Sequence, residues 1–168
     1  MRGQIIQVNL SAGGLPKYPI PQAFIGPLGL EGDDHLHLSV HGGPAKALLI
    51  VAAEAIDALI ADGFSLFYGA LGENLTVRGI GARWLRSGQR WRAGQAIIEL
   101  TRLRVPCSAL AAYDLPGRTF RSAIWDETLQ AIGNTSSPLW ALAGFYASVI
   151  QSGHVRPGDP FALLEQAV

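Results

Sequence analysis

The stretch AIIELTRLRVPC, residues 96–107, is a β-rich run that leads into the only cysteine of the chain. Side chains two residues apart share one face of a strand, so one face of this run should end in Arg102 and Arg104. Pro106 has no N–H for a ladder, and the strand should therefore stop there and leave Cys107 at its open end. Because two charged side chains on an inward face need a counter-charge, the pattern predicts an anionic ligand beside Cys107.

Cys107 itself is open to two interpretations. Two nearby guanidinium groups would favour the thiolate, which is the form that acts as a nucleophile and as a metal ligand. Alternatively, a single cysteine can be a small buried side chain without chemistry. The first interpretation predicts a thiol that reacts in the native protein, and the second predicts a thiol that is shielded until the protein unfolds.

Length and cysteine content limit the class of protein. A chain of 168 residues predicts one domain, residues 1–168, which can fold without a disulfide or a structural metal. The first ten residues contain no apolar signal core, so we expect a cytoplasmic protein. The longest strictly apolar run, Ala47–Ala53, is far shorter than the roughly 18 residues of a membrane span, and we expect no membrane association.

The charges are balanced overall but unevenly placed. A net charge of zero argues against a general nucleic-acid binder, yet seven arginines and one acid lie between Arg78 and Arg104. This window, which also holds two tryptophans, could stack on a nucleic acid, hold a small anion or form a solvated strand face. Eleven arginines against two lysines favour bidentate recognition of phosphate or carboxylate. We therefore expect a small-molecule anion and no nucleic acid.

The most polar and histidine-rich stretch is GLEGDDHLHLSVHGGP, residues 29–44. Three neutral imidazoles with an open fourth position suit a catalytic zinc ion, which would be bound here by Asp33, His35, His37 and His41. In a second interpretation, the turn at His41, Gly42 and Gly43 presents a ring N–H and backbone amides to one anion. A third is an ordinary turn that carries surface histidines.

The rest of the chain predicts many short strands and few helices. Apolar runs and period-two alternation predict strands within the ranges 3–10, 47–51, 71–79, 91–100, 139–151 and 161–164. Between them lie a long Gly/Pro-rich connection at 11–29 and a tight turn at 152–160. This pattern is typical of a mainly β fold, and we expect a largely antiparallel β-barrel with a few peripheral α-helices.

Two amphipathic helices are predicted by period 3.6. In residues 54–62 the side chains of Ile56, Leu59 and Ile60 share one face, and Gly63 should end the helix. A second helix should span residues 125–132 and end at Gly133. Residues 108–113 could form one further helical turn.

Five short motifs occur together in this order: LPK at 15–17, GLEGD at 29–33, HGGP at 41–44, GENL at 72–75 and RVPC at 104–107. With these motifs and the tail GFYASVIQSGHVRPGD at 144–159, the chain resembles the MOSC domain. This domain is found at the carboxy-terminal end of molybdenum-cofactor sulfurases and in small bacterial proteins. Gln89 stands where many members carry an acid, and residues 113–138 have no counterpart, which leaves substrate choice open.

The resemblance implies a barrel with a cleft for the molybdenum cofactor, molybdopterin. The family cysteine that matches Cys107 either ligates molybdenum or carries a persulfide sulfur, and both roles suit a soft thiolate. The cofactor contacts implied in this way are Lys17, His41, Gly42, Gly43, Glu73, Asn74, Arg102 and Arg104. The pyridoxal-phosphate desulfurase domain fused to some members is not found, so we expect no pyridoxal phosphate in this chain.

The resemblance also implies what the protein could do. One function is reduction of N-hydroxylated compounds at molybdenum, with electrons from a protein partner; the other is sulfur transfer from a sulfur donor to a cofactor enzyme. A non-catalytic carrier of the cofactor or of sulfur is an alternative. The zinc enzyme built on Asp33 and the three histidines is another.

Overall fold

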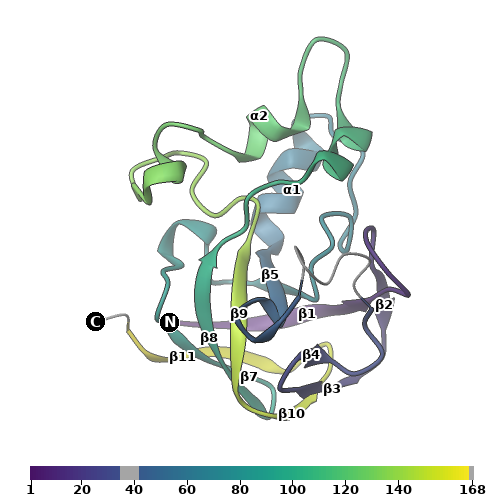
Figure 1. Cartoon of the computed structure of the whole chain (residues 1–168), viewed down its shortest axis with the longest axis vertical. Coiled ribbons are helices and arrows are strands. Elements are labelled where there is room, and N and C mark those ends of the chain that lie inside the picture. The colour runs from purple at the N-terminus through teal and green to yellow at the C-terminus, as the bar shows by residue number, and fades with distance from the viewer. Residues whose placement is uncertain (35–41, 167–168) are drawn as a thin grey trace.

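The computed structural model describes residues 1–34 and 42–166, and most of its strands belong to one barrel (Figure 1). The strands are β1 (Arg2–Leu10), β2 (Tyr18–Ile20), β3 (Ala23–Gly26), β4 (Gly29–Leu30), β5 (Leu48–Ala52), β6 (Leu75–Arg78), β7 (Arg90–Ala93), β8 (Ala96–Leu103), β9 (Phe145–Gln151), β10 (Gly153–Val155) and β11 (Pro160–Glu165).

The barrel has seven strands in the order β11-β7-β8-β9-β5-β6-β1, and the pairing of β11 with β1 closes it. Gly3 of β1 lies opposite Phe161 of β11 at this closure. Among the strands that the structure describes, only β5 and β6 pair in parallel, so the predicted barrel is confirmed and is of mixed type. Strands β10, β3 and β4 form a separate small sheet.

The apolar run at residues 47–51 shows no alternation of apolar and polar side chains, because strand β5 is buried on both faces. Leu48 and Ile50 point into the barrel core, while Leu49 and Val51 belong to a second apolar cluster on the outside of the barrel. A strand that is buried on both faces reads as continuously apolar. The second cluster is therefore the contact between the barrel and the segments that cover it.

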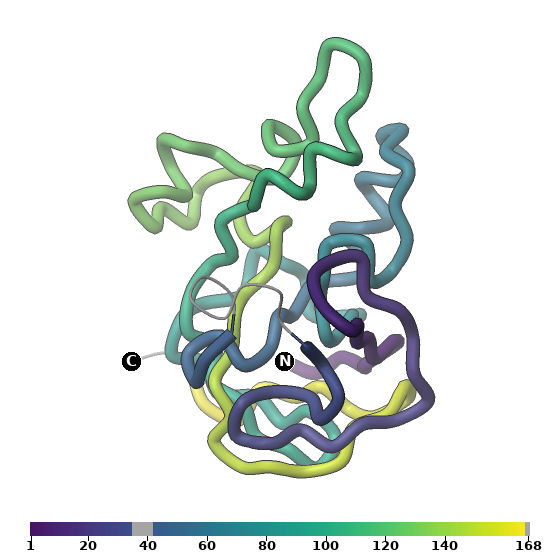
Figure 2. The backbone as a smooth tube through the Cα atoms, turned by 45° about the vertical axis from the view of Figure 1, so that its right-hand side comes forward, coloured from purple at the N-terminus to yellow at the C-terminus, as the bar shows by residue number. Residues whose placement is uncertain are grey.

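The covering layer contains the helices and lies at one end of the barrel, at the top of Figures 1 and 2. It consists of α1 (Ala53–Ala61), α2 (Phe120–Ile124) and nearby loops, and further 3-10 turns lie at Pro44–Lys46, Ala82–Trp84, Ser108–Tyr113 and Gln130–Ile132. The layer packs through buried side chains that include Ile56, Phe64 and Phe120. Within the described residues, no helix is both long and apolar enough to cross a membrane.

Several predicted elements differ from the structure. Ile60 is 42% exposed, so the buried face of α1 is narrower than period 3.6 predicts. The predicted helix at 125–132 is wrong, because Asp126 accepts hydrogen bonds from the backbone N–H groups of Thr128 and Leu129 and holds a turn there. The connection 11–29 and the turn 152–160 also contain the strands β2, β3 and β10.

Candidate functional site

A pocket of about 220 Å³ lies on the outside of the barrel, where its apolar wall forms part of the second cluster. Its lining residues come from the β1–β2 connection, from the residues before β5 and β5 itself, from the entry to β6, from the segment after β8 and from β9. The lining residues are Gly14, Leu15, Lys17, Asp34, Gly42, Lys46, Leu49, Leu71, Gly72, Asn74, Arg104, Cys107, Ala109 and Tyr146. The pocket therefore brings together residues from five sequence segments, among them both lysines and the only cysteine.

Cys107 and Arg104 meet at the end of β8. The backbone N–H of Arg104 donates to the carbonyl of Gly144 at 2.9 Å, which anchors the chain beside β9 after the ladder of β8 has ended. Pro106 is buried, and Cys107 directly precedes the 3-10 turn Ser108–Tyr113. The half-buried Cys107 lies with its Sγ 3.7 Å from Nη2 of Arg104. The predicted exit of the strand into a cysteine is thus confirmed.

Arg104 is buried without a counter-charge among the described residues. It is 3% exposed, and its Nε and Nη1 atoms find no hydrogen-bond acceptor in the part of the chain that the structure describes. A buried donor without an acceptor is costly, and such groups are rare in folded proteins. Because this side chain also lines the pocket, a ligand bound there would lie next to a guanidinium whose Nε and Nη1 lack acceptors.

Arg102 does not lie on the inner face, which corrects the period-two prediction. The register of β8 against β9 shifts between Leu100 and Arg102, so that Arg102 lies opposite Tyr146 instead of continuing the inward row. A β-bulge of this kind moves the following side chains to the other face. Arg102 is exposed, and the pocket-lining residues do not include it.

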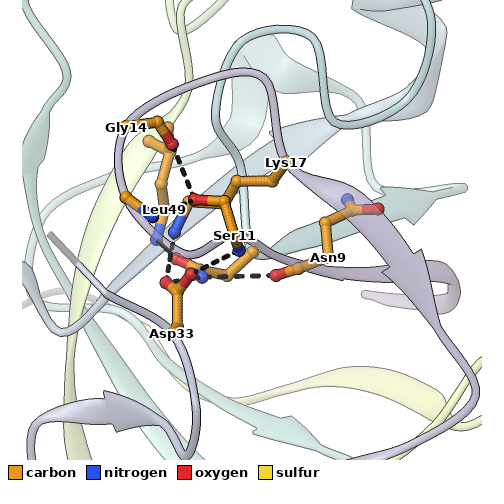
Figure 3. A network of polar contacts seen from close by, with 8 residues as sticks. Asn9, Ser11, Gly14, Lys17, Asp33 and Leu49 are labelled. Carbon is orange, nitrogen blue, oxygen red and sulfur yellow. Dashed lines mark hydrogen bonds and ion pairs between the residues drawn. The ribbon is translucent and has the colours of Figure 1, made fainter.

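Lys17 belongs to a polar network on the pocket wall (Figure 3). Asn74 joins this network through its hydrogen bond to Asp33. The carboxylate of Asp33 forms an ion pair with Lys17 and accepts hydrogen bonds from the Ser11 backbone at 3.0 Å and from Asn74 Nδ2 at 2.7 Å. Asn74 Oδ1 accepts from the backbone N–H of Leu49, which joins β5 to the entry of β6. Burial lowers the pKa of Lys17, and the charge of Asp33 opposes this effect. Both predicted contacts thus reach the pocket, but their polar groups already have partners.

Glu73 is fully buried behind the pocket and is not among its lining residues. Its Oε1 accepts hydrogen bonds from the backbone N–H of Gly69 at 2.6 Å and from Thr76 Oγ1 at 3.1 Å, whereas Oε2 finds no partner among the described residues. Burial raises the pKa of Glu73, and these hydrogen bonds oppose the shift. Glu73 therefore contacts other parts of the fold through these hydrogen bonds and does not line the pocket.

The glycine turn is divided between pocket and surface. Gly42 lines the pocket, whereas Gly43 is exposed and its carbonyl accepts the backbone N–H of Lys46 at 2.9 Å. The predicted zinc ligands His35, His37 and His41 lie outside the described residues. Within residues 1–34 and 42–166, no three His, Cys, Asp or Glu side chains form a group that could hold a metal ion.

Tyr146 and Lys46 are among the pocket residues that the sequence analysis did not predict. Tyr146 lies on the outer face of β9, between the core residues Phe145 and Ala147, and burial raises the pKa of its phenol while Arg104 opposes the shift. The ammonium of Lys46 lies 5.5 Å from the centre of the Tyr146 ring. The alternation of residues 145–147 was a usable signal for Tyr146, and the HGGP motif beside Lys46 was a weaker one.

The fold and the pocket define a mixed β-barrel protein with a thiol site under a helical cover. The model of the MOSC domain matches residues 37–162, and the chain therefore belongs to the MOSC domain family. This result confirms the resemblance found in the sequence motifs.

Two curated relatives have similar sequences. The chain is 31% identical over 139 residues to YflK of Bacillus subtilis, covering 81% of this chain and 56% of that protein. It is 30% identical over 144 residues to YiiM of Escherichia coli, covering 83% of this chain and 58% of that protein. The chain thus spans little more than half the length of these two proteins.

Solved structures share the fold. The crystal structure of YiiM from Geobacillus stearothermophilus superposes with a TM-score of 0.71 at 26% identity, covering 99% of this chain and 77% of the other. The YUAD protein of Bacillus subtilis gives the same TM-score of 0.71 at 19% identity, covering 99% of this chain and 98% of the other.

Proposed function

We propose that this protein binds the molybdenum cofactor in the pocket beside Cys107, and that the Cys107 sulfur is a ligand of the metal. The observation that carries the proposal is the position of the only thiol on the pocket wall, 3.7 Å from a buried guanidinium that has unpartnered N–H groups. The MOSC family is linked to this cofactor, and the match covers most of the chain.

The residues present fit the chemistry of the cofactor. A thiolate is a soft donor, and soft donors suit a soft metal centre. The cofactor also carries a phosphate and polar pterin edges, which need hydrogen-bond donors and positive charge. Arg104 has free donors, and Lys46 adds a second positive charge beside the same pocket.

The residues around the pocket would then have distinct tasks. Cys107 would hold the metal, and Arg104 would contact the sulfur through Nη2 and donate to an acceptor of the cofactor. Leu15, Leu49 and Leu71 would exclude water from the apolar side of the pocket. Lys17 and Asn74 would act through Asp33, by keeping the wall of the pocket in place.

The bound molybdenum would supply two-electron redox chemistry, and the reaction that we propose is reduction of N-hydroxylated small molecules. Electrons would come from a partner protein. A carrier that delivers cofactor or sulfur without turnover is the second candidate, because the same half-buried thiol could hold a persulfide. Turnover of an N-hydroxylated compound by the loaded chain with an artificial electron donor favours the enzyme; cofactor bound without turnover favours the carrier.

The proposal is tested by expressing the full chain in cells that make the cofactor and measuring molybdenum and released pterin per protein. We expect both in the wild type at about one equivalent, and a loss of molybdenum in Cys107→Ala because the variant lacks a soft donor. Arg102→Met is a matched control, since this arginine is exposed and should not change the metal content. A folded wild type with neither molybdenum nor pterin would exclude the proposal.

A further inference from the structure

The pair of Arg104 and Cys107 has a chemical capacity that does not depend on a metal. The thiol lines the pocket and is half-buried, so a small reagent that enters the pocket reaches the sulfur. The Arg104 guanidinium contacts the sulfur through Nη2 at 3.7 Å. An adjacent arginine stabilises the thiolate, which is the nucleophilic form of cysteine.

The same guanidinium offers more than one donor. Nε and Nη1 of Arg104 are buried and have no hydrogen-bond partner in the described part of the chain, and the residue is only 3% exposed. Donors that are already in place beside a nucleophile stabilise negative charge that develops on a leaving group. The site therefore combines a nucleophilic sulfur with donors for an oxygen anion.

We propose that Cys107 of the metal-free protein reduces hydroperoxides and that Arg104 stabilises the departing oxygen. In this reaction the thiolate sulfur attacks the terminal oxygen of an alkyl hydroperoxide. The S–O bond forms as the O–O bond breaks, the sulfur loses two electrons and becomes a sulfenic acid, and the alkoxide leaves and takes a proton from water. An alkyl hydroperoxide matches the pocket, because the leucine side chains at 15, 49 and 71 provide an apolar wall for the alkyl group.

The return step requires an external reductant, because the chain has no second cysteine to form an internal disulfide. One low-molecular-weight thiol would attack the sulfenic sulfur and release water, and a second thiol would reduce the resulting mixed disulfide. The products are the free Cys107 thiol and one disulfide of the small thiol. This activity goes beyond the proposed function and is separate from it, since it uses the sulfur while no metal occupies it.

The experiment uses the full chain prepared from cells that cannot make the cofactor. Oxidation by tert-butyl hydroperoxide is followed by trapping the sulfenic acid with dimedone and measuring the adduct at Cys107 by mass spectrometry. Alkylation by iodoacetamide is measured at the same pH. We expect the native protein to react with the hydroperoxide at least about tenfold faster than the urea-unfolded chain, because unfolding removes Arg104 from the sulfur.

Arg104→Met should lower the hydroperoxide rate by about tenfold to a hundredfold and the iodoacetamide rate by less, because a departing iodide needs no N–H donor. Arg104→Lys, which keeps the charge, should recover most of the alkylation rate but not the hydroperoxide rate. Arg102→Met is the matched control and should leave both rates unchanged, since Arg102 is exposed. An equal fall in both rates on Arg104→Met, or a native hydroperoxide rate no higher than that of the unfolded chain, would overturn the proposal. Because no metal is present, neither result depends on cofactor binding.

Discussion

Two buried cations on the wall of one pocket differ in their partners. Lys17 forms an ion pair with Asp33, and three hydrogen bonds join that carboxylate to Ser11 and Asn74, and Asn74 to Leu49. Arg104 is equally buried, but its contact is with the Cys107 sulfur, and two of its nitrogen atoms have no partner in the described residues. A buried charge whose hydrogen-bonding groups are all paired has no donors left for a ligand, whereas an unsatisfied one does. The difference separates the supporting wall from the reactive end of the pocket.

The largest effect should follow from removing the partner of Lys17. Asp33→Ala would leave a buried ammonium without its counter-charge, and we expect a loss of about 3–5 kcal/mol in the free energy of unfolding. Urea unfolding followed by tryptophan fluorescence measures this loss. The double variant Lys17→Met/Asp33→Ala is the control and should recover part of the stability, because no buried charge remains. A loss below about 1 kcal/mol for Asp33→Ala would place this ion pair in an environment open to water.

A smaller effect, and one that depends on pH, is expected from Glu73. Burial raises the pKa of this carboxyl, so the folded protein holds its proton at pH values at which the unfolded chain has lost it. The contribution of Glu73 to stability is therefore present below the ordinary pKa of about 4.5 and is lost as the pH rises through the raised value. Glu73→Gln should remove this decline and stabilise the protein at pH 7 by about 1–3 kcal/mol.

Urea unfolding of the wild type and Glu73→Gln from pH 4 to pH 8 would test this expectation. The two stability curves should diverge as the pH increases, with the variant more stable at the upper end. Parallel curves would mean that Glu73 is ionised in the native protein and that the nearby ammonium of Lys17 compensates its charge.

The smallest effect on stability is expected from Arg104. Arg104→Met replaces an incompletely hydrogen-bonded charge with an apolar side chain of similar length, and we expect the free energy of unfolding to change by less than about 1 kcal/mol. The measurement is the same urea titration, with Asp33→Ala as the comparison. A loss as large as that of Asp33→Ala would show that Arg104 supports the fold as Lys17 does, and the distinction between the two cations would not hold.

Strand β8 shows where sequence periodicity failed near the site. Ile98 and Leu100 point into the core as predicted, but the bulge before Arg102 changes the phase of the strand. Whether a residue is bulged depends on the register of the neighbouring strand, and that register involves residues about 45 positions further along the chain. The arrival of Arg104 and Cys107 at the end of this strand was therefore predictable, but the face that carries Arg102 was not.

The covering layer shows a second limit. The pattern of residues 125–132 is apolar at helical spacing, yet Ile132 is 76% exposed and a turn at Asp126 interrupts the segment. Local side-chain hydrogen bonds outweighed helical periodicity here. In α1 the prediction of a helix was confirmed, because a strong apolar pattern and a glycine after its end agreed with the packing.

The sequence by itself determined the barrel class, the family through five ordered motifs, and the exit of a strand into the only cysteine, because strand period, proline and motif order are local properties. Only the tertiary structure decided which side chains share a pocket with that cysteine. Lys17, Arg104 and Tyr146 are distant in sequence, and their distances, burial and partners depend on how the barrel closes and on what covers it. Arg104 therefore has unpartnered donors beside the pocket. Lys17, a cation on the same wall, is instead held in an ion pair with Asp33.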